Sequence, residues 1–364
     1  MHLTVVPPES VVAEHARPAP ETASSAAAAH PWLFRILPGL GLVAVIAVVA
    51  GAIGARIPVV GGPVLAVAIG MVVATLRPMH ASMRTGISFA STYGLQAAIV
   101  LLGMGLSLTQ VATTGSASVW VMLGTLTIAL SGAYVFSRIL KVPGDVATLI
   151  GVGTAICGAS AIAATASVTR PHERDVAYAI STIFLFNVVA VLVDPLLGHL
   201  MHLTQHSFGL WAGTAINDMS SVVAAGYTYG PSAGAYAVIV KLARSTAILP
   251  ISLALLVWRT WRGRKGGAAT TGRERSFWRA FPWFIVWFLL ASLAHTLGLV
   301  PPAVDRLAAP LGMAMIVVAL AAIGLSARVR EMAATGPRPL LLGFFLWVTV
   351  GAASLVLQHA TGTL

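Results

Sequence analysis

The feature that most constrains this chain is a series of apolar segments, each about as long as a lipid bilayer is thick. A helix needs about 20 apolar residues to cross a hydrocarbon core of roughly 30 Å. Of the 364 residues, 57 % are hydrophobic and 9 % are charged, whereas about a quarter of the residues in a soluble protein are charged. The sequence therefore predicts an all-α polytopic membrane protein with about eleven transmembrane helices. The predicted spans are 36–54, 59–76, 87–106, 118–137, 146–168, 176–198, 208–228, 233–258, 280–298, 309–326 and 339–358.

Charge and cysteine content exclude several classes of protein. The net charge of +11 comes from bases that lie mainly in short loops between apolar windows, as the positive-inside rule expects. We therefore expect these bases to face the lipid bilayer, and we expect no nucleic-acid partner. A single cysteine, Cys157, excludes an internal disulfide bond and a multi-cysteine metal site. The sequence indicates no metal, no cofactor and no catalytic residue.

The distribution of bases predicts how the chain lies in a cell inner (plasma) membrane. Residues 1–30 are predicted to be a disordered cytoplasmic tail, and 31–364 a transmembrane domain that contains a basic cytoplasmic linker at 257–279. With a cytoplasmic amino terminus, sixteen bases lie inside and four outside. Arg170 and Arg174 are two of the four, and a re-entrant fifth segment would explain them differently.

A run of residues in one predicted span returns sixty residues later in another. The run at 153–162 reads GTAICGASAI, and the run at 213–222 reads GTAINDMSSV, so the chain contains an internal repeat. Polar and glycine residues in mid-span interrupt a helix, and hydrocarbon tolerates the break only where it faces protein or a wet cavity. We expect two discontinuous helices whose second halves begin near Ser160 and Ser220, with positive dipole ends facing the break. A tight helix contact made by the same small residues is the alternative.

Three ionisable residues lie in mid-span near the second copy of the repeat. Asp218, Lys241 and Arg244 must face protein or water, because a charge in hydrocarbon costs at least about 2.5 kcal/mol. Counted from Tyr229 in the intervening turn, Asp218 is eleven residues back and Lys241 twelve residues forward, so both lie about 17 Å deep. We expect Asp218 to pair with one base, which leaves about one positive charge for an anion. A static ion pair that joins two helices is the alternative.

These features define a candidate substrate site between the two breaks. Lys241 and Arg244 are expected to attract the anion, and Ser160, Ser220 and the half-helix N–H groups to hydrogen-bond it. Asn187 lies at a similar depth and either donates a hydrogen bond or holds helices together. The candidate substrate-binding residues are Cys157, Gly158, Ser160, Asn187, Asn217, Asp218, Ser220, Ser221, Lys241 and Arg244.

Several blocks of the sequence resemble the sulfate exporter family of bacterial inner-membrane proteins. They are LGMGLS at 102–107, GTAICGASAIAA at 153–164, FLFN at 184–187, GTAINDMSSVVAAG at 213–226 and KLAR at 241–244. The resemblance implies a relative of the bile-acid/sodium symporters and cation/proton antiporters, with panel and core domains and two crossed, broken helices. It also implies export of sulfate or a related small anion.

The chain departs from the pattern of that family at two positions. Asn217 stands where the family usually has His, and Met219 stands where it has Thr. The loss of His removes a side chain that titrates near neutral pH, which argues against proton coupling at this position. In the related antiporters the broken helices cross antiparallel, whereas eleven spans make the two copies parallel, so the span count and the resemblance disagree.

We therefore expect a secondary transporter that moves a small inorganic or organic anion across the inner membrane by alternating access. A proton or sodium ion is the candidate coupling ion, and a homodimer is the candidate assembly. A cation/proton antiporter that uses Asp218 is the alternative. A membrane-embedded enzyme built on Cys157, or on His199, His202 and His206, is disfavoured because no nucleophile, base and orienting group occur together.

Overall fold

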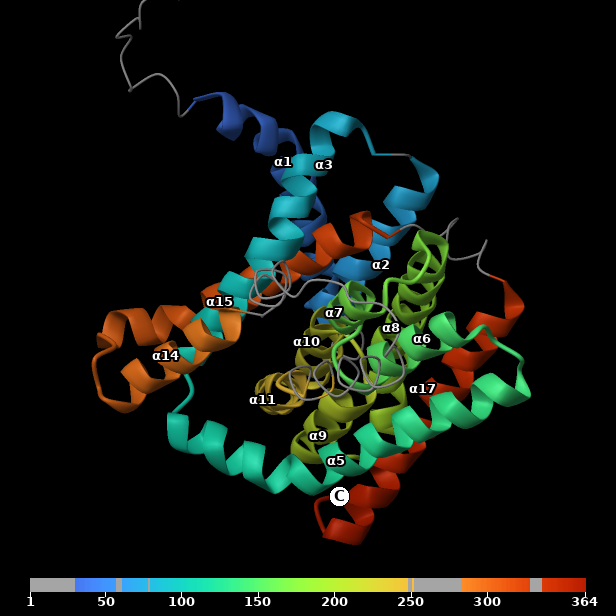
Figure 1. Cartoon of the computed structure of the whole chain (residues 1–364). Coiled ribbons are helices and arrows are strands. Elements are labelled where there is room, and N and C mark those ends of the chain that lie inside the picture. The colour runs from blue at the N-terminus through green and yellow to red at the C-terminus, as the bar shows by residue number, and fades with distance from the viewer. Residues whose placement is uncertain (1–29, 57–60, 78, 248–250, 252–282, 328–335) are drawn as a thin grey trace, which may run out of the picture.

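A computed structural model of the chain describes residues 30–56, 61–77, 79–247, 251, 283–327 and 336–364, and this part is helical with no strands (Figure 1). The predicted tail at 1–30, except for His30, and the linker at 257–279 lie outside the described residues. The helices are α1 (His30–Gly54), α2 (Gly61–Leu76), α3 (Ala81–Phe89), η1 (Ala90–Gly94), α4 (Leu95–Gly103), α5 (Leu108–Ile139), α6 (Gly144–Ala155), α7 (Ala159–Thr169), α8 (Glu173–Leu200), α9 (Gln205–Ala215), α10 (Met219–Tyr229), α11 (Pro231–Ser245), α14 (Phe284–Thr296), α15 (Pro302–Leu325) and α17 (Pro337–Thr361).

Six helical segments of the described part are long and apolar enough to cross a membrane, namely α1, the continuous run from α3 to α4, α5, α8, α15 and α17. Two further apolar helices, α2 and α14, are shorter. The prediction of an all-α chain with several helices able to cross a membrane is therefore confirmed for the described residues. The finer prediction of about eleven spans is not, because six segments pass this test and two predicted spans have a different shape.

The predicted span at 146–168 is a hairpin of two short helices, α6 and α7, that turns back on itself. A Cβ atom on Gly153 would lie 3.1 Å from the side chain of Ile162. Residues nine positions apart in a continuous helix are about 13.5 Å apart along its axis, so α7 must fold back along α6. The turn contains Gly158 at φ +68° and ψ −127°, a backbone conformation that is essentially restricted to glycine.

The predicted span at 208–228 is a second hairpin, formed by α9 and α10. The side-chain oxygen Oε1 of Gln205, at the start of α9, accepts a hydrogen bond from the N–H of Ser232 at 3.0 Å. Tyr229, at the end of α10, donates its hydroxyl to the carbonyl of Leu203. A helix running straight through from Gln205 to Tyr229 would separate these ends by about 36 Å. The chain therefore enters and leaves on the same side.

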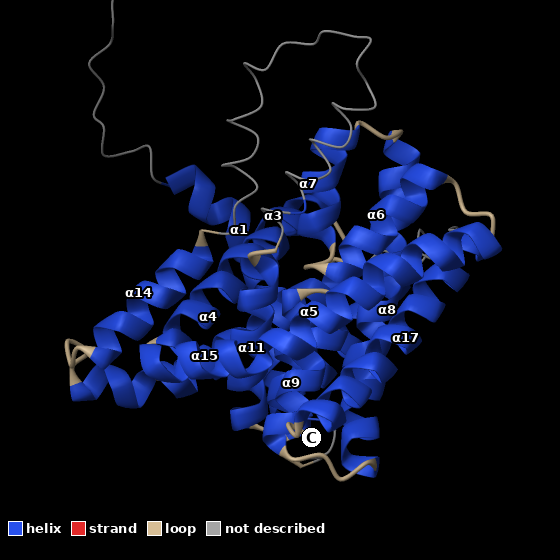
Figure 2. Cartoon of the chain, turned by 60° about the horizontal axis from the view of Figure 1, so that its bottom comes forward, coloured by secondary structure: helices blue, strands red, loops and turns tan. Residues whose placement is uncertain are grey.

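The long helix α17 shows that the two hairpins enter from opposite ends. The first residues of α6 share a buried apolar cluster with Leu342 and Leu346, and the end of α6 packs near Val350. In α9 the order is reversed, because Ser207 bonds the carbonyl of Thr363 at 3.3 Å and Thr214 bonds Ser354 at 2.7 Å. The hairpin tips therefore meet beside the middle of α17. Figure 2 shows α6 and α7 in the upper part of the molecule and α9 near the carboxyl terminus.

The helices form two groups that lie side by side (Figure 1). The panel group consists of α1 to α4, α14 and α15, and its buried apolar residues form one continuous core. The core group consists of α5 to α11 and α17 and contains both hairpins. Helices α8, α10 and α11 of the core group pack against the panel group, and Val191, Val223 and Leu242 join its apolar core. This boundary is where the site lies.

Candidate functional site

The deepest charged residue pair of the described chain lies on α11. This helix begins with Pro231 at its first position, where the missing N–H costs no hydrogen bond, and runs unbroken to Ser245. Lys241 and Arg244 are three residues apart on one face of α11, and both have no exposed surface. Both side chains point toward the tips of the two hairpins.

Lys241 joins the two hairpin tips through their backbone. Its ammonium donates hydrogen bonds to the carbonyl of Ile156 at 2.9 Å and to the carbonyl of Ile216 at 2.8 Å. Ile156 and Ile216 are the residues that end α6 and α9. The carbonyls at a helix end have no partner within the helix and carry partial negative charge, so one buried cation satisfies both ends.

Arg244 also binds backbone carbonyls of both hairpins, one or two residues earlier in each. Its guanidinium donates to the carbonyls of Ala155 at 2.7 Å, Thr154 at 3.0 Å and Thr214. Thr154 and Thr214 are sixty positions apart, as are the two isoleucines bound by Lys241, and sixty is the spacing of the sequence repeat. Equivalent carbonyls from the two copies are therefore held by the same two side chains.

Asp218 does not form the predicted ion pair with Lys241 or Arg244, since no such contact occurs among the described residues. Instead its carboxylate caps the start of α10 and accepts the N–H of Ser220 at 3.0 Å and the hydroxyl of the same serine. The N–H of Asp218 donates to Oδ1 of Asn187 on α8 at 3.3 Å. The second hairpin tip is thus anchored to α8 as well as to α11.

The second half of each broken helix begins one residue earlier than predicted. Helix α7 begins at Ala159 and α10 at Met219, so Ser160 and Ser220 lie in the first turn and are not the capping residues. The residue that precedes α7 is Gly158, which has no side chain to cap the helix. Because Ala159 and Ser160 are exposed, the positive end of α7 is open, whereas Asp218 occupies that of α10.

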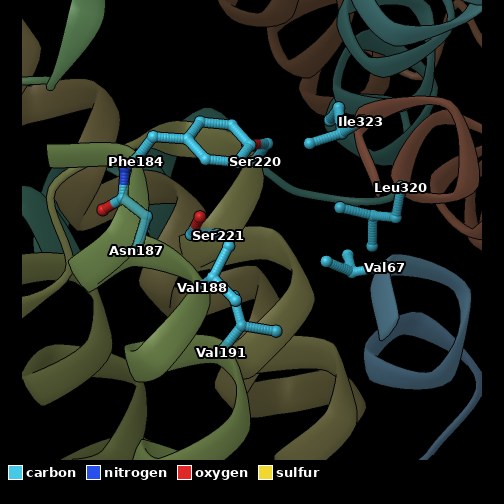
Figure 3. Close-up of a pocket in the computed structure, with 9 residues that line it drawn as sticks. All are labelled: Val67, Phe184, Asn187, Val188, Val191, Ser220, Ser221, Leu320 and Ile323. Atoms are coloured by element: carbon cyan, nitrogen blue, oxygen red, sulfur yellow. The ribbon is translucent and has the colours of Figure 1, made fainter. Parts of the chain in front are cut away.

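A small pocket lies where the core group meets the panel group (Figure 3). Its polar residues, Asn187 from α8 and Ser220 and Ser221 from α10, lie on one side. The remaining lining residues are apolar and come from α2, α8 and α15; they are Val67, Phe184, Val188, Val191, Leu320 and Ile323. Three of the ten predicted substrate-binding residues therefore line this pocket.

The other predicted residues lie near the pocket without lining it. Cys157 and Asn217 are buried in the two tips, and Lys241 and Arg244 lie behind them, bonded to backbone. Oδ1 of Asn217 is buried and has no hydrogen-bond partner in the part of the chain that the structure describes. Sequence reasoning missed all six apolar residues that line the pocket, because an apolar residue in an apolar span gives no signal of its own.

His199, His206 and Asp194 do not line this pocket. His199 stacks on Tyr229 at 4.3 Å between ring centres, and His206 contacts Tyr236 at 3.9 Å. Within the described ranges no group of three metal-binding side chains occurs. Asp194 is buried on α8, with 2 % of its surface exposed.

Comparison with known proteins identifies the family. Residues 38–343 match the family described as "Conserved hypothetical protein 698". A UPF0324 membrane protein of Streptococcus pyogenes serotype M6 is 42 % identical over 335 residues, which cover 90 % of this chain and 98 % of that protein. The chain belongs to the UPF0324 family of membrane proteins. Other members of the family are similar over nearly their whole length.

Two of these relatives show how far the similarity extends among bacteria. A UPF0324 membrane protein of Fusobacterium nucleatum is 37 % identical over 344 residues, which cover 89 % of this chain and 98 % of that protein. One of Streptococcus mutans is 39 % identical over 337 residues, with 90 % and 98 % covered. The family name supports a membrane protein, and the six candidate spans of the described part are consistent with several crossings.

Proposed function

We propose that this UPF0324 protein is a secondary transporter of a small anion. The observation that carries the proposal is that two helical hairpins enter from opposite ends and meet at a buried centre beside a pocket. Interrupted helices whose ends meet in mid-membrane are the usual construction of a transport site. Because the pocket lies between the core and panel groups, a relative movement of these groups would open it first to one side and then to the other.

The charges around the hairpin tips favour an anion. The carboxyl ends of α6 and α9 and the amino ends of α7 and α10 carry partial charges of opposite sign, about half an elementary charge each, which cancel. Two cations, Lys241 and Arg244, and one carboxylate, Asp218, then leave about one positive charge. A buried centre with this excess of positive charge attracts an anion more than a cation.

We propose that the anion binds between the pocket and the open amino end of α7. Asn187, Ser220 and Ser221 line the pocket, and Ser160 lies in the exposed first turn of α7. Hydroxyl, amide and free N–H groups suit the oxygen atoms of a sulfate, sulfonate or carboxylate. Lys241 and Arg244 act as positioning residues, since they hold the two tips and do not line the pocket.

The hairpin geometry also bears on orientation in the cell membrane. Since α6 and α7 form a re-entrant hairpin, the turn at 170–173 lies on the same side as the start of α6. Moving Arg170 and Arg174 to that side changes the sequence-based split of bases from 16 to 4 into 18 to 2. The positive-inside rule then assigns this side, and with it the amino terminus, to the cytoplasm.

A cation/proton antiporter remains the second candidate because of one observation. Asp218 is half-buried beside a pocket residue, Ser220, where a carboxylate can exchange a proton or bind a cation. Against this function, Asp218 also caps α10, and protonation during transport would weaken the hydrogen bond that its carboxylate accepts from the Ser220 N–H.

Flux measurements on purified protein in liposomes distinguish the two functions. Uptake of radiolabelled sulfate, sulfite and a small organic sulfonate is compared with uptake of ²²Na⁺, each with and without a pH gradient. We expect saturable uptake of at least one anion, reduced by Ser221→Ala, which removes one pocket hydroxyl. Exchange of ²²Na⁺ for protons without anion uptake would establish the antiporter instead.

A further inference from the structure

The ammonium of Lys241 lies between two backbone carbonyl oxygens, one from the tip of each hairpin. Two backbone carbonyls, from Ile156 and Ile216, bind it at 2.9 Å and 2.8 Å. Both belong to residues where a helix is interrupted, so neither carbonyl is used within a helix. Unwound carbonyls at the ends of half-helices are the groups with which many transporters coordinate a sodium ion.

A further oxygen on the second tip has no partner. Oδ1 of Asn217 is buried and unbonded among the described residues, and Asn217 directly follows Ile216 in the chain. A buried amide oxygen without a hydrogen bond is unfavourable by about 1–3 kcal/mol. The tip region thus offers one oxygen more than the Lys241 ammonium uses.

We propose that the Lys241 ammonium is a built-in cation that replaces a bound Na⁺ or K⁺ at the junction of the two hairpin tips. Its charge and compact shape satisfy the same carbonyls that a monovalent metal ion would bind. The chain therefore needs no metal cation at this position, and removal of the side chain opens a site for one.

Arg244 is the natural comparison, because it also binds carbonyls of both hairpins. Its planar guanidinium distributes three hydrogen bonds over Thr154, Ala155 and Thr214. A spherical metal ion cannot reproduce the planar, directional hydrogen bonds of the guanidinium, whereas it can replace the compact charge of a lysine ammonium. The replacement is thus specific to Lys241.

Thermal unfolding of the purified full-length protein in detergent tests this proposal. Wild type, Lys241→Ala and Lys241→Met are compared in NaCl, KCl and N-methylglucamine chloride at equal ionic strength. We expect the Tm of Lys241→Ala to lie below that of wild type in N-methylglucamine and to rise saturably with Na⁺ or K⁺ by at least about 2 °C. Lys241→Met is the matched control, since its neutral side chain fills the space and should abolish the response.

The wild-type protein provides a second test that does not depend on the stability of a variant. We expect its Tm to be the same in the three salts and its binding of ²²Na⁺ to show no saturable component. Saturable ²²Na⁺ binding by wild type, or a saturable rise of its Tm with Na⁺, would overturn the proposal. A folded Lys241→Ala protein whose Tm does not change with Na⁺ or K⁺ would also overturn it. These measurements need no substrate, so they stand apart from the proposed transport of an anion.

Discussion

Gly158 and Asp218, sixty residues apart in the sequence, lie against each other where the two hairpin tips meet. A Cβ atom on Gly158 would lie 3.4 Å from the Cβ of Asp218 and 3.5 Å from the side chain of Ile183 on α8. Behind this contact, Lys241 bonds the carbonyl that precedes each tip. The corresponding breaks of both repeat copies are thus held together by this packing contact and by two buried cations, Lys241 and Arg244.

Substitution of Gly158 tests the first tip. Gly158→Ala should lower the free energy of unfolding by about 1–3 kcal/mol, because φ +68° with ψ −127° is strained for any residue with a side chain. Gly115→Ala is the matched control, since Gly115 lies within α5 and a Cβ there meets no atom within 4 Å. Thermal unfolding of both variants in detergent checks the difference, and equal Tm values would contradict the described turn.

Substitution of Asp218 separates its charge from its hydrogen bonds. Asn also caps helices well, so Asp218→Asn should retain the stability of wild type, whereas Asp218→Ala should lose about 1 kcal/mol. Under the proposed function Asp218→Asn also retains anion uptake, because it removes a negative charge near the site. Measurement of Tm and of anion uptake in liposomes checks both expectations. Loss of anion uptake in a stable Asp218→Asn protein would show that the carboxylate itself takes part in transport and would contradict the second expectation.

A large side chain at the panel wall should obstruct the pocket. Ile323 lines the pocket from α15, so Ile323→Trp should reduce anion uptake at least about tenfold while the protein remains folded. Leu311→Trp on the same helix is the control, because Leu311 is 52 % exposed on the outer surface of the described part. Equal uptake by the two variants would exclude this pocket from the transport path.

The sequence predicted the positions of the two helix interruptions better than their shape. Periodic apolar windows and the repeat identified the two interruptions, and the structure places them at 156–158 and 216–218. The sequence-based estimate that Lys241 and Asp218 lie at the same depth agrees with the structure, in which Lys241 bonds the carbonyl of Ile216 in the second tip. A span count, however, cannot distinguish a segment that crosses from one that turns back, because both are apolar and of similar length.

The roles of the charged residues could not be derived from the sequence. Charge counting favoured a side-chain partner for Lys241, whereas the structure gives it two backbone carbonyls, which no sequence pattern displays. The cap formed by Asp218 follows the ordinary preference for Asp at a helix start. It could be predicted only if the first residue of α10, Met219, were known. Two sequence signals pointed to a re-entrant segment: the charges of Arg170 and Arg174 on the less basic side, and the disagreement between the span count and the family resemblance.

Side-specific labelling tests the opposed hairpins most directly. Single cysteines replace Gly144, His172, Met201 and Ser232, which are exposed at the hairpin ends, in a Cys157→Ala background, and a membrane-impermeant maleimide is applied to each side of the membrane. Two opposed hairpins predict that positions 144 and 172 react from one side and positions 201 and 232 from the other. Reaction of 144 with 201 on one side, and of 172 with 232 on the other, would show two through-going spans and contradict the account.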